Sequence, residues 1–265
     1  MTNLQTVFAR AKAENRAALI GYLPAGFPTK EGAIAAATAM VESGCDVIEI
    51  GLPYSDPLMD GPTIQDAVHT ALTNGTRIAD VMRTVEGVAK TGAATLVMTY
   101  WNPIDQYGAE RFARDLANAG GTGTITPDLT PEEAEPWRQA SADAGIDTVF
   151  LVAPSSTRER IKAVVDCCTG FVYAASLMGI TGARDSVNTA AEGLVAATRE
   201  QTSLPVCVGL GIGNGRQAAE VAAYADGVIV GSAFIRRMLD APDEKSGLAA
   251  VSALAAELAE GVRQR

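Results

Sequence analysis

Short apolar segments recur along the chain, and longer segments with a helical pattern lie between them. The predicted strands cover residues 17–23, 46–52, 95–100, 122–126, 147–153, 170–176, 205–211 and 226–232. The predicted helices include 30–43, 131–145, 215–225 and 245–262, with an extra helix over 3–14 before the first strand. Continuous apolar strands that alternate with helices are typical of a parallel sheet covered on both faces.

Two of the predicted helices begin at recognisable start signals. Thr29 precedes the helix that starts at Lys30, and Asp128 and Pro131 stand ahead of Glu132. Eight strand–helix units in 265 residues favour a closed (β/α)8 TIM barrel with an extra N-terminal helix. An open doubly wound sheet is the alternative. Because no linker or low-complexity stretch divides the chain, we expect a single domain over residues 1–265.

The charge balance and the cysteines narrow the classes of function. The formal net charge of −10 argues against a nucleic-acid or anionic-membrane surface, because both need a basic patch. No apolar run is long enough to span a membrane, and the N-terminus lacks a signal-peptide pattern. The cysteines lie in apolar segments without metal-ligand spacing, which indicates reduced core thiols at Cys45, Cys167, Cys168 and Cys207. The expected location is the cytoplasm.

One acid stands inside a predicted strand, where Glu49 lies between Ile48 and Ile50. Strand alternation puts Val47 and Glu49 on one face, and the apolar pair suits the face that packs on helices. Glu49 then points into the barrel mouth, where a poorly solvated carboxyl group has a raised pKa and holds a proton near neutral pH. The alternative is a glutamate that is satisfied by backbone amides or by a neighbouring cation.

The loop after this strand carries two more acids, Asp56 and Asp60. Asp60 precedes Gly61 and Pro62, so it is either a functional carboxylate or the cap of the helix that starts there. Asp56, followed by Pro57, has the same ambiguity and stands nearer the loop tip. In TIM barrels the functional groups lie at the C-terminal ends of the strands and on the following loops, which is where Glu49 and Asp60 stand.

Two glycine-rich turns follow the last two predicted strands, GLGIGNG at 209–215 and VGSAF at 230–234. The corresponding loops of TIM barrels commonly bind phosphate through backbone N–H groups and a helix N-terminus. Neither turn contains a lysine or arginine before Arg216, so a phosphate would rely on amides and the Ser232 hydroxyl. One such turn is a weak signal, since tight turns use glycine anyway, but two on adjacent strands predict a phosphate site.

A third loop, residues 176–188, is polar and contains two glycines, as a mobile lid does, and Thr181 and Gly182 lie near its start. The only histidine, His69, lies in a predicted helix and is interpreted as an ordinary helix residue. The sequence therefore offers no Ser-His-Asp triad, no metal-ligand cluster, and few lysines near strand ends for Schiff-base chemistry. The chemistry that remains is acid–base catalysis by carboxylates on a phosphorylated substrate.

The stretch IEIGLPYSDPLMDGPTIQ, residues 48–65, resembles the signature of the tryptophan synthase alpha subunit family. That signature is a strand glutamate followed by G-x-P-x-S-D-P-x-x-D-G-P-x-I-Q. The likeness continues over nearly the whole chain: TPDLTPEEA (126–134) is similar to the family's P-D-L-P-x-E-E segment, GITGAR (179–184) to its lid, and GLGI and VGSA to its phosphate turns. The resemblance implies cleavage of indole-3-glycerol phosphate to indole and glyceraldehyde 3-phosphate in tryptophan biosynthesis.

The resemblance also implies roles for individual residues. It places Glu49 and Asp60 at the two catalytic carboxylates. Phosphate contacts are implied for Gly182, Gly211, Gly231 and Ser232, and substrate contacts for Tyr22, Met98, Tyr173, Thr181 and Leu210. Contacts with a partner subunit are implied for Pro53, Asp56 and Pro57.

The family pairs this barrel with a PLP-dependent beta subunit in an alpha2beta2 tetramer, so no cofactor is expected in this chain. The chain departs from the family's pattern at Tyr22 and Leu210, where phenylalanine is commoner, and at Leu177, where some members carry arginine. Two other functions stay open. One is another phosphosugar-binding barrel enzyme, which usually needs a metal, a lysine or a further carboxylate at other strand ends. The second is a non-catalytic phosphate-binding subunit that regulates its partner.

Overall fold

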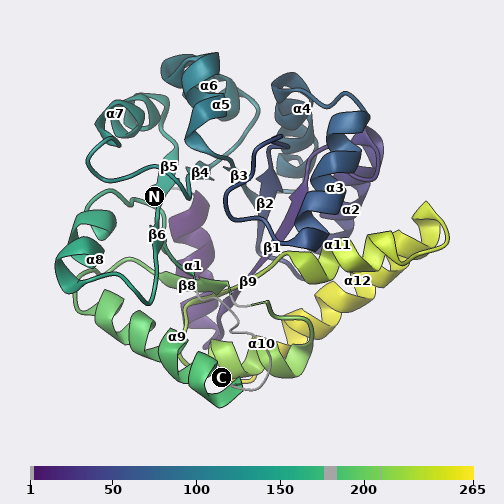
Figure 1. Cartoon of the computed structure of the whole chain (residues 1–265). Helices are drawn as coiled ribbons and strands as arrows, with labels where there is room; N and C mark the ends of the chain where they lie inside the picture. Colours follow the sequence, from purple (N-terminus) through teal and green to yellow (C-terminus); the bar gives the residue numbers. More distant parts are fainter. Residues whose placement is uncertain (1–2, 176–183, 210) are drawn as a thin grey trace.

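The computed structural model describes residues 3–175, 184–209 and 211–265 and forms a barrel of parallel strands surrounded by helices (Figure 1). The strands in this part of the chain are β1 (Ala18–Pro24), β2 (Val47–Gly51), β3 (Ala94–Met98), β4 (Gly123–Ile125), β5 (Asp147–Val149), β6 (Leu151–Val152), β7 (Val172–Ala175), β8 (Val206–Gly209) and β9 (Gly227–Val230). Their order in the sheet is β5-β4-β3-β2-β1-β9-β8-β7-β6, and each neighbouring pair is parallel.

The barrel closes at the fifth predicted strand, because residues 147–153 form two strands that flank Phe150. β5 pairs with β4, and β6 pairs with β7. Residues 147–152 therefore form both the first and the last strand in the order of the sheet. The N–H of Phe150 donates to Sγ of Cys168 at 3.4 Å, while its carbonyl oxygen accepts from the N–H of Tyr173. The prediction of a closed barrel is confirmed, and the alternative of an open doubly wound sheet is wrong. The prediction of one uninterrupted strand over residues 147–153 is also wrong.

Helices alternate with the strands and cover the outside of the barrel. They are α1 (Asn3–Ala13), α2 (Lys30–Glu42), α3 (Pro62–Thr73), α4 (Ile78–Ala89), α5 (Trp101–Tyr107), α6 (Ala109–Asn118), α7 (Glu135–Ala144), α8 (Arg158–Val165), α9 (Arg184–Arg199), α10 (Gly215–Ala222), α11 (Ser232–Leu239) and α12 (Glu244–Gly261). The other strands begin and end within two residues of their predicted limits.

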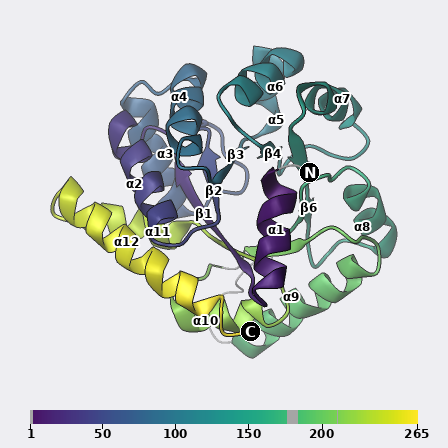
Figure 2. The ribbon, with the colours of Figure 1, turned by 180° about the vertical axis from the view of Figure 1, so that it is seen from behind.

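The first helix closes the end of the barrel at which the strands begin. Figure 2, the view from behind, shows α1 lying across the strands. Leu4 and Phe8 of α1 pack against inward-facing side chains, and the rings of Phe8 and Phe171 meet edge-on with centroids 5.8 Å apart. The predicted extra helix is confirmed as an apolar plug, which leaves the opposite end of the barrel open for chemistry.

The register between β1 and β2 places Tyr22 directly beside Glu49. Val47 belongs to the apolar cluster inside the barrel, whereas Ile48 and Ile50 pack in the cluster between barrel and helices. The alternation predicted for this strand is therefore confirmed, and it directs Glu49 inward.

One of the two predicted helix starts is confirmed. The Thr29 hydroxyl accepts a hydrogen bond from the N–H of Gly32 at 2.8 Å and so caps α2. The helix predicted from residue 131 instead begins at Glu135, next to Pro136, whose fixed backbone suits a first helical turn. Asp128 acts on a different helix, since its carboxylate accepts from the N–H of Trp101 at 2.9 and 3.1 Å at the start of α5.

The remaining predictions about the body of the protein concern cysteine and histidine. All four cysteines are free and buried, as predicted for core thiols. His69 is an exposed residue of α3, which confirms its interpretation. Within the described residues, no helix has the length and apolar character needed to cross a membrane.

Candidate active site

A cavity of about 240 Å³ opens at the end of the barrel where the strands finish. It is lined by Tyr22, Glu49, Met59, Asp60, Ile64, Met98, Tyr173, Gly209, Gly211, Ile229, Gly231 and Ser232. The structure thus brings together both predicted carboxylates, three predicted wall residues and three predicted phosphate contacts. A cavity of about 430 Å³ lies beside Arg16 and Asp46, but those charges pair with each other at 2.6 Å, so size alone does not mark the site.

Glu49 is a buried carboxyl group, and among the described residues one of its oxygens is unpaired. Its side chain projects from β2, the residue is 1% exposed, and Oε1 has no hydrogen-bond partner among the described residues. Burial raises the pKa of Glu49 to about 8. At pH 7 the protonated form of Glu49 therefore predominates. Burial is the one cause of this rise, and no amide or cation among the described residues opposes it, so the described residues do not support the alternative of a satisfied glutamate.

Asp60 is held by a tyrosine instead of by the adjacent helix. Its Oδ1 accepts a hydrogen bond from the Tyr100 hydroxyl at 3.1 Å. The residue that caps α3 is Gly61, and no side-chain bond is made there, so the alternative in which Asp60 caps this helix is wrong. Burial raises the pKa of Asp60, and the hydrogen bond from Tyr100 opposes that rise.

Tyr100 is the functional neighbour that sequence reasoning missed. Its hydroxyl donates to Asp60 and also accepts from the N–H of Met59 at 3.0 Å, so it fixes two successive residues of the loop after β2. The available signal was its position at the C-terminal end of the third predicted strand, where functional groups of a barrel gather. Met59, Ile64 and Ile229 also line the cavity without having been predicted.

The predicted phosphate turn lies at the start of α11, with Gly231 as the residue before the helix and Ser232 as its first member. The N–H groups of a first helical turn have no intrahelical acceptor and carry partial positive charge, which suits an anion. Gly231 packs closely against the ring of Tyr22, since a Cβ there would lie 3.2 Å from Cδ1 of that residue. Gly211 lies across the cavity with a φ of +65°, a backbone conformation that favours glycine.

The walls of the cavity include two tyrosines that lie over glycines of the next strand. A Cβ on Gly51 would be 2.3 Å from the Tyr22 hydroxyl oxygen, and one on Gly209 would be 2.3 Å from that of Tyr173. Glycine is thus required at both strand ends for the rings to lie as they do. Met98 is half-buried at the end of β3 and completes the predicted wall.

Some predicted residues lie outside the described part of the chain, namely Thr181, Gly182, Leu210 and Leu177. Of the predicted partner contacts, Pro53 is buried, Pro57 is half-buried and Asp56 is exposed. Asp56 accepts a hydrogen bond from the Ser55 hydroxyl at 2.5 Å. Among the described residues, no group of three or more His, Cys, Asp and Glu side chains is arranged to hold a metal ion.

Comparison with known proteins identifies the family of this barrel. The family model Tryptophan synthase alpha chain matches residues 8–263. The chain is 61% identical to the tryptophan synthase alpha chain of Thermobifida fusca over 266 residues, which cover 99% of this chain and 98% of the relative. It is 54% identical to that of Mycobacterium marinum over 264 residues, which cover 100% of this chain and 96% of the relative.

Solved structures give the same result. A structure of Mycobacterium tuberculosis tryptophan synthase matches with a TM-score of 0.91 and 52% identity, covering 99% of this chain and 98% of that chain. Tryptophan synthase subunit alpha from Legionella pneumophila matches with a TM-score of 0.90 and 33% identity, covering 99% of this chain and 98% of that chain. With its closed barrel and a match over almost its full length, the chain belongs to the tryptophan synthase alpha chain family.

Proposed function

We propose that this chain uses Glu49 and Asp60 to cleave indole-3-glycerol phosphate into indole and glyceraldehyde 3-phosphate. As a tryptophan synthase alpha chain it is a carbon–carbon lyase of tryptophan biosynthesis. The observation that carries the assignment of residues is the pairing of two unlike carboxyl groups in one cavity. Glu49 is fully buried and holds its proton at neutral pH, whereas Asp60 accepts a hydrogen bond that favours its ionised form.

The bond between indole C3 and the side chain breaks only if the indole ring accepts its electrons. Protonated Glu49 delivers a proton to C3, which gives an indolenine cation with positive charge at the ring nitrogen. The Glu49 carboxylate then takes the proton of the side-chain hydroxyl, and the carbon–carbon bond electrons return to the ring. Indole and an aldehyde result, and Glu49 regains the proton with which it began.

Asp60 stabilises the charge that develops during this cleavage. A fixed anion beside the ring nitrogen lowers the energy of the cation far more in a water-poor cavity than in bulk water. This role requires an ionised carboxylate in a fixed position, and the Tyr100 hydroxyl provides both a hydrogen bond and an anchor. The rigid strand holds the proton donor, while the loop after β2 holds the anion.

The rest of the cavity provides the binding energy in this proposal. Gly211, Gly231 and Ser232 bind the phosphate through backbone N–H groups and a hydroxyl, and Tyr22, Met98 and Tyr173 contact the indole side. For Thr181, Gly182 and Leu210 the proposed contacts rest on the family resemblance alone. The proposal places no cofactor in this chain.

The alpha chain family implies a beta-subunit partner. We propose an alpha2beta2 tetramer in which PLP is bound by the beta subunit. Asp56 and Pro57 are the surface contacts available to it, and the buried Pro53 acts by shaping the loop. The free thiols of all four cysteines fit a reducing compartment, so we propose the cytoplasm as the location.

One assay tests the function directly. The purified chain is incubated with indole-3-glycerol phosphate, with and without a beta subunit, and indole release is measured. Wild-type protein should release indole, and Glu49→Gln should lose about 10²–10⁴-fold of the rate, because an amide neither delivers nor accepts the proton. A wild-type chain that binds phosphate but releases no indole under either condition is a non-catalytic regulatory subunit.

A further inference from the structure

A cavity of about 520 Å³ lies at the end of the barrel where the strands begin, opposite the candidate active site. Its walls come from α1 and from the segments that precede β7, β8 and β9. Figure 2 shows the C-terminus near α9 and one end of α1, and Arg265 lines this cavity. Because α1 lies across the strand starts as a rod, it leaves space beside it that the barrel does not fill.

The cavity is lined by cations although the protein is acidic. The chain has a formal net charge of −10, yet only one acid, Asp226, stands among the described residues that line this cavity. The basic residues among them are Lys12, Arg16, Arg199 and Arg265. Such an excess of cations in a concave site attracts anions.

The pairing of these charges shows which of them are available to a ligand. Arg16 binds both carboxylate oxygens of Asp46, at 2.6 and 2.8 Å, so its charge is compensated. Arg199 lies 2.9 Å from Oδ2 of Asp226, and Arg265 lies 3.9 Å from Oδ1 of the same residue. One carboxylate thus serves two arginines, while the ammonium group of Lys12 has no partner among the described residues.

The cavity on the other side of α1, beside Asp46, shows the contrast. Arg10 and Arg16 both bind Asp46 there, and Arg16 also binds Glu14 at 2.6 Å. Its cations are held by acids of the same cavity, and no lysine lines it. Of the two cavities beside α1, the one that contains Lys12 is therefore the better anion site.

Apolar groups complete the walls of the Lys12 cavity. Phe8, Leu204 and Pro205 line it together with the cations. A cavity that combines apolar walls with a few charged groups is typical of a site for a small organic molecule. The charged groups alone would suit an inorganic ion, and the apolar groups favour a ligand with an apolar body.

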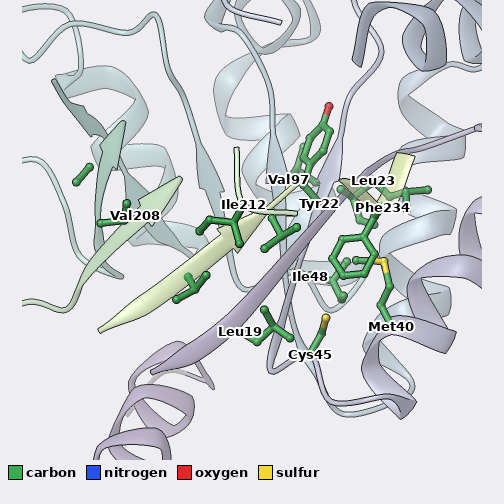
Figure 3. Close-up of a cluster of buried hydrophobic side chains, with 14 of the residues drawn as sticks. Leu19, Tyr22, Leu23, Met40, Cys45, Ile48, Val97, Val208, Ile212 and Phe234 are labelled. Carbon is green, nitrogen blue, oxygen red and sulfur yellow. The ribbon is translucent and has the colours of Figure 1, made fainter. Parts of the chain in front are cut away.

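This cavity is separate from the candidate active site. Phe8 at one end and Ile229 at the other belong to the same apolar cluster, which fills the barrel between the two cavities. Figure 3 shows that the neighbouring cluster likewise extends from Leu19 and Cys45 to Tyr22, which lines the active site. A ligand in the Lys12 cavity would therefore not touch the substrate.

We propose that the Lys12 cavity binds an organic monoanion, a carboxylate carried on an aromatic or aliphatic body. Lys12 and the arginines beside it offer charge-assisted hydrogen bonds to the carboxylate. Phe8, Leu204 and Pro205 remove the apolar body from water. The Asp226 carboxylate at the same wall repels a second negative charge, so a carboxylate fits better than the dianion of a phosphate monoester.

The test follows the backbone N–H signals of the whole chain by NMR during titration with 4-phenylbutyrate. The signals of Ala9, Thr202 and Ser203 should shift and reach saturation, because these residues line the cavity. Two matched probes separate the two kinds of contact: 4-phenylbutyramide keeps the apolar body without the charge, and acetate keeps the charge without the body. Each should bind about tenfold or more weakly than 4-phenylbutyrate. Added salt should also weaken the binding of 4-phenylbutyrate.

Lys12→Gln is the informative variant, because the Lys12 ammonium group holds no other described group in place. It should bind 4-phenylbutyrate about fivefold or more weakly than wild type. Lys245→Gln is the control, since Lys245 is exposed on α12 and does not line the cavity, and its affinity should equal that of wild type.

Several results would overturn the proposal. They are equal affinity in wild type and Lys12→Gln, equally tight binding of either matched probe, and the absence of any shift at millimolar 4-phenylbutyrate. Shifts confined to Gly211 and Gly231 would do the same, because they would place the probe in the candidate active site. Indole release is not measured in this test, so the proposed function and the anion site succeed or fail independently.

Discussion

The Tyr100 hydroxyl donates a hydrogen bond to Oδ1 of Asp60 at 3.1 Å. The oxygen of this Tyr100 hydroxyl also accepts a hydrogen bond from the N–H of Met59 at 3.0 Å. One residue at the end of the third strand thereby sets both the backbone and the side chain of the loop that follows the second. The position of the acid therefore depends on a residue that is 40 positions away in the sequence.

Replacing Tyr100 by phenylalanine should lower kcat by on the order of tenfold, because Asp60 loses its donor and the loop loses an anchor. The loss should be largest at acidic pH, where Asp60 without its donor is protonated more readily. Steady-state kinetics of indole release from pH 5.5 to 8 measures both effects.

Tyr54→Phe is the matched control for this change. The ring of Tyr54 packs against that of Tyr100 with centroids 5.6 Å apart, but its hydroxyl accepts from Asn102 at 3.0 Å and does not touch Asp60. We expect its kcat in the isolated chain to stay within about twofold of wild type. Equal losses in the two variants would show that the effect is not specific to the bond between Tyr100 and Asp60.

The sequence could predict Glu49 because strand alternation is a local property. Three residues, Ile48, Glu49 and Ile50, suffice to assign the inward side chain, and the structure agrees. The partner of Asp60 was beyond reach, because local sequence offers a helix cap at Gly61 as an equally good explanation. Only the fold brings Tyr100 within hydrogen-bond distance.

The limits of the fold prediction have the same cause. The apolar pattern at 147–153 predicts one strand. In the structure the N–H of Phe150 bonds to Cys168, and the pairing partner changes there from β4 to β7. Asp128 carries a sound local signal for capping, and it does contact a helix N-terminus, but that of α5 in the preceding unit. These features depend on contacts between different strand–helix units, and the periodicity of apolar residues within one unit cannot predict such contacts.

Glu49 should make the folded barrel less stable as the pH rises. Its pKa is about 8 in the folded state and near 4.5 when unperturbed, so between these values the folded state holds a proton that the unfolded state has released. The folded state binds more protons there, and the free energy of unfolding falls with rising pH. Between pH 5 and pH 8 the free energy of unfolding should fall by on the order of 3 kcal/mol because of this group.

Urea unfolding of wild type and Glu49→Gln at pH 5 and pH 8 measures this contribution. The glutamine has no proton to lose, and subtracting the two proteins cancels the titration of the other groups. The variant should gain stability relative to wild type between the two pH values. An identical pH dependence in both proteins would show that Glu49 has an ordinary pKa.

Gly209→Ala should raise KM for indole-3-glycerol phosphate several-fold, because the new Cβ would lie 2.3 Å from the Tyr173 hydroxyl and force the ring into the cavity. The double variant Gly209→Ala with Tyr173→Phe removes the nearest clashing atom and should recover part of the loss relative to Tyr173→Phe alone, because Cζ of the ring still lies 2.9 Å from the new Cβ. Additive effects in this four-protein cycle would show that the two residues do not conflict.

Gly231→Val should weaken the binding of inorganic phosphate at least tenfold, because a branched side chain blocks the approach to the N–H groups at the start of α11. Calorimetric titration of the folded variant measures the affinity. Gly193→Val in α9 is the control, since a Cβ there meets nothing within 4 Å. Equal phosphate affinity in Gly231→Val and wild type would place the anion elsewhere.

Asp56→Ala should remove most of the stimulation that a beta subunit gives to indole release. Asp56 is exposed on the loop that carries Asp60, and Leu58 and Met59 follow it with 74% and 51% of their surface exposed. A partner that contacts this loop favours one arrangement of Asp60 through differential contacts, and linkage requires that substrate in turn tighten the partner. The basal rate of the isolated chain should stay the same, because Asp56 lies outside the cavity.

Asp66→Ala, which replaces an exposed acid in α3, is the control and should keep full stimulation. Unchanged stimulation in Asp56→Ala, measured at saturating beta subunit, would show that coupling runs through another surface.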